Sequence, residues 1–154
     1  MISKRSIDMQ LSLNGAFKLK SPLKKTFLFL ADSKKLSTCI PNAQKTNLIN
    51  NTAFTTRFSI GVGFIKGNFD VRCETVPKPP DLVSIIVDGS GAGSRMRVRL
   101  SIHLKDAKGK FTDVEWSADA EVGGIISGLG ESMLKDISKS KIDEIIREFE
   151  KRIK

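Results

Sequence analysis

Between residues 53 and 124 the sequence alternates apolar with polar residues, in segments separated by short runs of Gly, Pro, Asn and Asp. Alternation with a period of two places the apolar side chains on one face of a β-strand. Strands at this spacing, joined by tight turns, form an antiparallel meander with one apolar and one polar face. Any fold of this chain must therefore contain an antiparallel sheet whose apolar face is covered.

The first fifty residues add one more strand and two short helices. The alternation between residues 9 and 19 resumes in phase after Asn14-Gly15, which we interpret as a bend within a single strand. Pro22 is suited to the first turn of a helix. Asp32 is suited to the N-cap of a second short helix, which ends before Pro41.

The last thirty residues are helical by composition, from about Ile125 to Arg152. Their two apolar stripes are displaced from one another around the helix, by roughly a third of a turn or more. Three explanations stay open: the helix curves around a twisted sheet, it breaks near "SKSK", or its second half faces a partner. Gly123 and Gly124 are the expected hinge from strand to helix, because glycine reaches backbone dihedrals that other residues avoid.

Composition places the chain among globular proteins. It has 154 residues, 40% of them hydrophobic and 28% charged, and we expect a single domain spanning residues 1–154. Two cysteines without a CxxC pair and a single histidine argue against a disulfide framework and a Cys/His zinc site. The N-terminus is too polar for a signal peptide, and no apolar run approaches about 18 residues. We therefore expect a cytoplasmic protein with reduced thiols and no metal.

The formal net charge of +9 is concentrated in the first fifty residues, which hold nine Lys and Arg against two acidic residues. The expected basic surface consists of Lys24, Lys25, Lys34 and Lys35. These lysines either only keep the protein soluble or dock it on an anionic membrane or an acidic partner.

Two rows of opposite charge are expected on neighbouring strands. The basic row is Arg95, Arg97, Arg99 and His103, and the acidic row is Asp113, Glu115, Asp119 and Glu121. If the chain turns back within residues 105–110, the two rows lie opposite one another and pair across the strands. Their charge is then already matched, so we expect no nucleic-acid partner.

Three motifs follow one another along the chain. They read "LNGAFKLKSPLKKTFLFLADSKKLSTCIPN", "VGFIKGNFDV" and "WSADAEVGGIISGLG". Together they resemble the opening strand and helices, a hairpin, and the last strand with its double glycine and helix start in the family of CoxG, a carbon monoxide dehydrogenase subunit. That family is part of the START/SRPBCC superfamily, also called Bet v 1-like. The resemblance spans nearly the whole chain and departs at Asn42, where relatives usually have glycine.

The resemblance implies an α+β helix-grip fold. In that fold an antiparallel sheet of about seven strands wraps around a long C-terminal helix, with two short helices after the first strand. It also implies a non-enzymatic accessory protein that carries an apolar molecule, namely a lipid, a quinone or an aromatic compound, for a molybdenum-containing dehydrogenase. It implies no cofactor. Many relatives continue into a membrane-seeking tail where this sequence stops at Lys154, so anchoring by a tail is not carried over. The oligomeric state stays open.

A hydrophobic cavity is expected where the C-terminal helix moves away from the sheet, beyond a close approach at Gly128 and Gly130. A fully packed core is the alternative, because gaps in protein interiors are few. Trp116 points inward by alternation, and its indole N–H is the polar group expected to orient a ligand. The expected lining consists of Phe27, Leu30, Phe54, Phe58, Phe69, Val71, Val98, Trp116, Ala118, Leu129, Met133 and Ile137.

Residues suited to catalysis are few. His103 is expected on the outward, charged face, and Cys39 is expected to be a structural thiol. Asp88 is the best candidate for an acid in the cavity, although its strand is apolar on both faces. A cyclase or hydrolase of the same superfamily would need a titratable group there. The glycine-rich "DGSGAGSR" is expected to be a turn and not a phosphate-binding loop, because a strand follows it.

Overall fold

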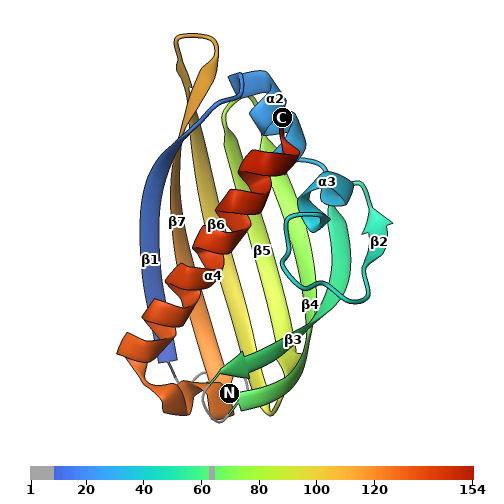
Figure 1. Ribbon diagram of the computed structural model, residues 1–154, viewed down its shortest axis with the longest axis vertical. Helices are drawn as coiled ribbons and strands as arrows, with labels where there is room; N and C mark the ends of the chain where they lie inside the picture. Colours follow the sequence, from blue (N-terminus) through green and yellow to red (C-terminus); the bar gives the residue numbers. More distant parts are fainter. Residues whose placement is uncertain (1–8, 63–64) are drawn as a thin grey trace.

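The computed structural model describes residues 9–62 and 65–154 (Figure 1). Within these residues seven strands form one antiparallel sheet, in the spatial order β1-β7-β6-β5-β4-β3-β2. The strands are β1 (Met9–Leu19), β2 (Asn47–Asn50), β3 (Ala53–Val62), β4 (Ile65–Lys78), β5 (Leu82–Gly91), β6 (Ser94–Ala107) and β7 (Phe111–Gly124). The meander predicted from the alternation is confirmed from β2 to β7. The turn predicted around Gly63 and Phe64 lies outside the described residues.

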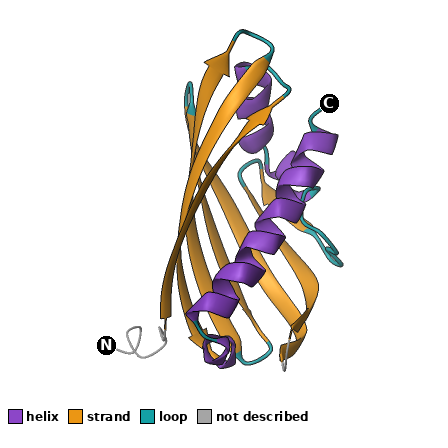
Figure 2. Ribbon diagram, turned by 60° about the vertical axis from the view of Figure 1, so that its left-hand side comes forward, coloured by secondary structure: helices purple, strands orange, loops and turns teal. Residues whose placement is uncertain are grey.

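The helices lie together on one face of the sheet, which we call the inner face (Figure 2). They are α2 (Leu23–Leu30), α3 (Ser33–Ser37), the short 3-10 helix η1 (Ile125–Leu129) and α4 (Glu131–Arg152). The sheet curves around α4, which crosses it diagonally and ends beside α2 (Figure 1). This arrangement confirms the predicted α+β helix-grip fold. The charged rows of the strands lie on the opposite face, the outer face.

Strand β1 is continuous, as the in-phase alternation predicts. It pairs with β7 from Met9 opposite Val122 to Leu19 opposite Thr112, without interruption at Gly15. Asn14-Gly15 is therefore part of a single strand and not a hairpin turn.

Buried hydroxyl groups fasten α2 to the sheet. Thr112 of β7 donates a hydrogen bond to the Ser21 carbonyl (2.7 Å), and Thr75 of β4 donates one to the Leu30 carbonyl (2.8 Å). Both threonines are fully buried, where an unpaired hydroxyl is costly. Asp32 caps α3 as predicted, because its Oδ1 accepts hydrogen bonds from the Lys34 and Lys35 amides (2.9 and 3.4 Å).

The C-terminal helix begins later than its composition predicts. Gly130 separates η1 from α4, with φ of 87° and ψ of 157°, a conformation essentially confined to glycine. No atom lies within 4 Å of where a Cβ of Gly130 would be, and Gly128 is exposed. The expected close approach of these two glycines to the sheet is therefore wrong, since Gly130 instead ends one helix and starts another. From Glu131 onward α4 runs unbroken through Ser138–Lys141.

Gly124 shapes the junction between β7 and η1. Its φ is 87°, and a Cβ on it would collide with the carbonyl oxygen of Gly93 in the β5–β6 turn. Its neighbour Gly123 stays in the regular ladder opposite Arg95. The Ile126 amide then donates a hydrogen bond to the Ser94 hydroxyl (2.8 Å), so η1 is tied to the start of β6.

Two separate clusters of buried apolar side chains form the core on the inner face. The larger one lies under α2 and the C-terminal half of α4, where the rings of Phe29 and Phe149 are 5.1 Å apart. The smaller one lies at the N-terminal end of α4 and consists of Leu11, Val122 and Leu134. The helix is therefore held to the sheet near its two ends.

Replacing Gly130 by alanine tests its backbone role. Because a side chain there is strained although nothing crowds it, we expect Gly130→Ala to lower the free energy of unfolding by about 1–3 kcal/mol in urea titrations. Gly61→Ala is the matched control, since Gly61 has open space and an ordinary φ. We expect the control to change stability by less than about 1 kcal/mol. Equal losses in the two variants would contradict this explanation.

Candidate functional site

The residues predicted to line a ligand cavity lie on the inner face, but they differ in burial. Those that are buried are Phe27, Leu30, Phe54, Phe69, Val71 and Ala118. Those that are half-buried are Phe58, Val98, Trp116, Leu129 and Ile137. Met133 stands apart, because 48% of it is exposed and the next residue, Leu134, packs inward in its place.

Trp116 packs against the larger core cluster and Leu129 against the smaller one, whereas other half-buried apolar side chains belong to neither. Leu13, Met96 and Val98 point to the inner face from β1 and β6, and Ile137 points to it from α4, yet each remains partly exposed. Among the described residues, none of these four packs into either cluster. The inner face is thus closed at both ends of α4 and incompletely covered in the middle.

Trp116 lies on the inner face directly opposite Gly15 on β1. A Cβ on Gly15 would fall 2.7 Å from Cζ2 and 2.8 Å from Nε1 of the indole, so the ring lies against the glycine. Within the described residues the indole N–H has no hydrogen-bond partner. Trp116 therefore offers a free donor on an otherwise apolar surface.

The residues weighed for catalysis do not face this surface as acids or nucleophiles. Asp88 points to the outer face, where its Oδ1 lies 3.6 Å from Nε of Arg97, so the interpretation of an inward acid is wrong. Burial raises the pKa of Cys39 to about 11 and that of Cys73 to about 12. Both side chains stay neutral thiols near pH 7, unlike reactive cysteines. His103 lies on the outer face, 3.7 Å from Asp81.

The predicted charge rows lie opposite one another on the outer face. Arg97 pairs in register with Glu121, Arg99 with Asp119, and His103 with Glu115. Lys105 forms an ion pair with Glu115 at 3.1 Å. The two rows thus place opposite charges side by side, as the alternation predicts.

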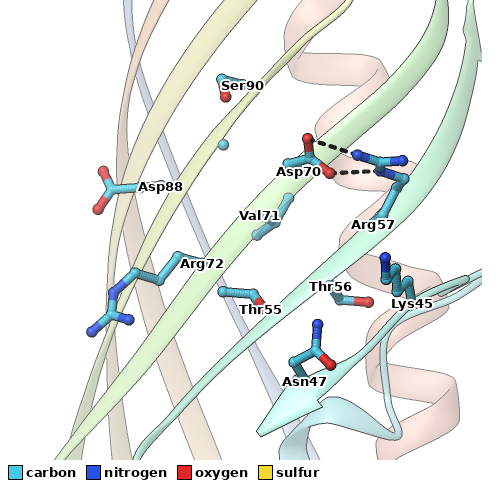
Figure 3. Close-up of a pocket in the computed structure, with 11 residues that line it drawn as sticks. Lys45, Asn47, Thr55, Thr56, Arg57, Asp70, Val71, Arg72, Asp88 and Ser90 are labelled. Atoms are coloured by element: carbon cyan, nitrogen blue, oxygen red, sulfur yellow. Dashed lines mark hydrogen bonds and ion pairs between the residues drawn. The ribbon is translucent and has the colours of Figure 1, made fainter. Parts of the chain in front are cut away.

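A cavity of about 460 Å³, bordered mostly by charged and polar residues, opens on the outer face across β3, β4 and β5 (Figure 3). Arg57 and Asp70 face one another in it, with Nε to Oδ1 at 2.7 Å and Nη2 to Oδ2 at 3.3 Å. These hydrogen bonds lower the pKa of Asp70. Lys45 and Asn47 border it from the segment before β3, and Arg72 borders it from β4. No pattern in the sequence predicts this cavity, because it depends on how residues 43–50 fold back along β3.

The four lysines of the expected basic surface are exposed. Lys24 and Lys25 lie in the first turn of α2, and Lys34 and Lys35 lie in α3. Within the described residues none of them forms an ion pair. Leu28 of α2 lies among them in sequence and is 52% exposed.

The described residues contain neither a membrane-spanning helix nor a cluster of metal-ligating side chains. No helix there has the length and apolar character needed to cross a membrane. No group of three or more His, Cys, Asp or Glu side chains there is placed to hold a metal ion.

Comparison with known proteins connects this arrangement to one family and one fold. Residues 15–154 match the family model of CoxG, a carbon monoxide dehydrogenase subunit. None of the curated proteins compared with the chain matches it significantly. The structure of a conserved protein from Geobacillus kaustophilus is 28% identical, with a TM-score of 0.83 over 93% of this chain and 95% of that one.

More distant structures share the fold. A START superfamily protein from Mycobacterium smegmatis is 9% identical, with a TM-score of 0.69 over 92% of this chain and 96% of that one. Norcoclaurine synthase from Thalictrum flavum, solved with dopamine and hydroxybenzaldehyde, is 13% identical, with a TM-score of 0.62 over 94% of this chain and 88% of that one. The fold is therefore START-like.

The contact between Gly15 and Trp116 can be tested by Gly15→Ala. The added methyl group overlaps the indole and must displace it, so we expect the fluorescence of this single tryptophan to shift to longer wavelength. We also expect a loss of stability of about 1–3 kcal/mol, as for other overpacked sites. Gly61→Ala, which touches nothing, serves as the control for emission. An unchanged emission maximum in Gly15→Ala would show that the ring does not rest on the glycine.

Proposed function

Because this chain belongs to the CoxG family of carbon monoxide dehydrogenase subunits, we propose that it is a non-catalytic accessory protein that binds an apolar small molecule between α4 and the sheet. The observation that carries the proposal is the half-buried stretch of inner face between the two core clusters. Apolar side chains such as Val98 and Ile137 remain partly exposed there. A ligand in this position removes that surface from water, which stabilises the complex by about 25 cal/mol per Å².

The surroundings favour a particular class of ligand. The inner face is apolar, and the indole N–H of Trp116 is its free hydrogen-bond donor within the described residues. A mostly apolar site with a few polar groups suits a lipid, a quinone or an aromatic molecule that carries an acceptor such as a carbonyl oxygen. The family name supports a carbon monoxide dehydrogenase as the kind of enzyme that the protein serves.

An enzymatic role has less support. Norcoclaurine synthase has this fold, but a fold hosts many functions, and function depends on the residues of the site. In this chain Asp88 faces outward, and Cys39 is a core thiol with a raised pKa. Neither supplies the titratable group that an enzyme would need on the inner face.

Native mass spectrometry of the freshly purified protein, followed by organic extraction, tests the binding proposal. We expect an adduct of a few hundred daltons, in keeping with sites of about 300–1,000 Å³, that extracts as a lipid, quinone or aromatic compound. Bare protein that also takes up no added quinone or fatty acid would contradict it.

Substitutions of two valines distinguish an interior with a ligand site from a fully packed interior. We expect Val98→Phe to fill the half-covered region, so that ligand uptake falls while the free energy of unfolding changes by less than about 1 kcal/mol. The matched control is Val83→Phe, because Val83 is fully buried in the larger cluster. Overpacking there is expected to cost about 1–3 kcal/mol. Similar losses of stability in both variants would indicate a packed interior without a binding site.

Docking on an anionic membrane is a second candidate function. It is supported by the four exposed lysines of α2 and α3, which have no ion-pair partner among the described residues, and by the exposed side chain of Leu28. Basic residues at an anionic lipid surface contribute about 1 kcal/mol each. Such docking is compatible with ligand binding, because α2 and α3 lie at one end of the inner face (Figure 1).

Vesicle co-sedimentation tests this second candidate. We expect binding to phosphatidylcholine vesicles that contain about 30% phosphatidylglycerol, and loss of binding at high salt. Charge reversal to Glu at Lys24, Lys25, Lys34 and Lys35 should weaken binding at least roughly tenfold. The same reversal at Lys66, Lys78, Lys108 and Lys139, which are also exposed, is the matched control. An unaffected affinity in the first variant would refute docking through α2 and α3.

A further inference from the structure

We propose that the cavity on the outer face of β3, β4 and β5 binds a small multivalent oxyanion, either a phosphate or a polycarboxylate, between Lys45 and Arg72 (Figure 3). The cavity has a volume of about 460 Å³. Small-molecule sites in proteins measure about 300–1,000 Å³. This site lies on the face of the sheet opposite α4, so it does not rest on the proposed ligand between α4 and the sheet.

The cavity carries an excess of positive charge. Three cations and two carboxylates border it, and both carboxylates have a cation of their own. Asp70 is bound through both oxygens by Arg57, and Asp88 lies 3.6 Å from Arg97, which stands outside the cavity. Neither Lys45 nor Arg72 is hydrogen-bonded to these carboxylates, although Lys45 attracts Asp70 electrostatically and Arg72 lies opposite Asp88 in register. The ion pair of Arg72 with Glu74 is long, at 3.8 Å, and Lys45 has no ion pair among the described residues.

Neutral hydrogen-bonding groups accompany these two cations. The side chains of Asn47, Thr55 and Ser90 border the cavity, and none of them has a partner within the part of the chain that the structure describes. Amide and hydroxyl groups donate hydrogen bonds to oxyanions, and ionised donors such as Lys and Arg make the stronger ones. Figure 3 shows Lys45 and Asn47 reaching toward β3 from one side of the cavity, with Arg72 on the other.

The segment that carries Lys45 and Asn47 is held in place before any ligand binds. Thr46, which lies between them, shares a hydrogen bond with Thr56 of β3 (2.9 Å), and the Gln44 amide donates to the Arg57 carbonyl (2.7 Å). Groups already fixed in position lose less conformational entropy when a ligand binds. The segment that carries Lys45 and Asn47 is therefore held in place before a ligand binds, although both side chains lie at the surface.

Titration of the ¹⁵N-labelled protein, followed by NMR at neutral pH, tests the site. Pyrophosphate and citrate are added separately, with NaCl adjusted to keep the ionic strength constant, because screening alone shifts surface resonances. We expect saturable shifts of the amides of Lys45, Asn47, Thr55 and Arg72. Saturation by pyrophosphate alone identifies a phosphate site, saturation by citrate alone a polycarboxylate site, and saturation by both a general oxyanion site.

Matched variants show whether the cavity itself is responsible. We expect the double variant Lys45→Gln, Arg72→Gln to bind at least roughly tenfold more weakly, since two charged donors are lost. Lys139→Gln, Arg99→Gln removes the same charge from exposed positions outside the cavity and should bind as the original protein does. Asn47→Asp, which adds a negative charge beside Lys45, should also abolish binding. Shifts that never saturate, or equal weakening in the control, would overturn the proposal.

Discussion

The inner face depends on how α4 is held against the sheet. The helix buries Leu134 near its start and Phe149 near its end, which are roughly 22 Å apart at the rise of an α-helix. Each side chain belongs to a different core cluster. Attachment at two distant points leaves the middle of the sheet incompletely covered, and Trp116 rests on Gly15 near this region. The proposed ligand site follows from this attachment, whereas the position of its polar group follows from the pairing of Trp116 with Gly15.

The sheet could be predicted from the sequence because each strand is specified by the alternation of its own neighbouring residues. A period of two decides which side chains face inward, and a one-residue slip would expose all of them to water. The same rule places Arg97 opposite Glu121 and Trp116 opposite Gly15 once the turns are identified. Strand β5 shows the limit of this rule. Ile85 and Ile86 are adjacent and both apolar, so alternation alone did not reveal that Asp88 faces outward.

Other features depend on tertiary structure that no local pattern carries. Gly130 breaks the helix through its backbone dihedrals, although the residues around it favour a helix. Val98 is only partly buried although it points to the inner face, and this depends on which parts of the sheet the helices cover rather than on the residue type. The outer cavity depends on the fold-back of residues 43–50, which places Lys45 and Asn47 beside β3, across the cavity from Arg72 of β4.

Because the two clusters differ in size, the two ends of α4 are held to the sheet with unequal strength. Fifteen buried residues make up the larger cluster and three make up the smaller, among the residues that the structure describes. Regions with fewer buried apolar contacts open at lower free energy than the global unfolding transition. Leu134 therefore separates from Leu11 and Val122 more readily than Phe149 leaves its cluster. The start of α4 is therefore the end of the helix that local opening releases at lower free energy, while Phe149 holds the other end in the larger cluster.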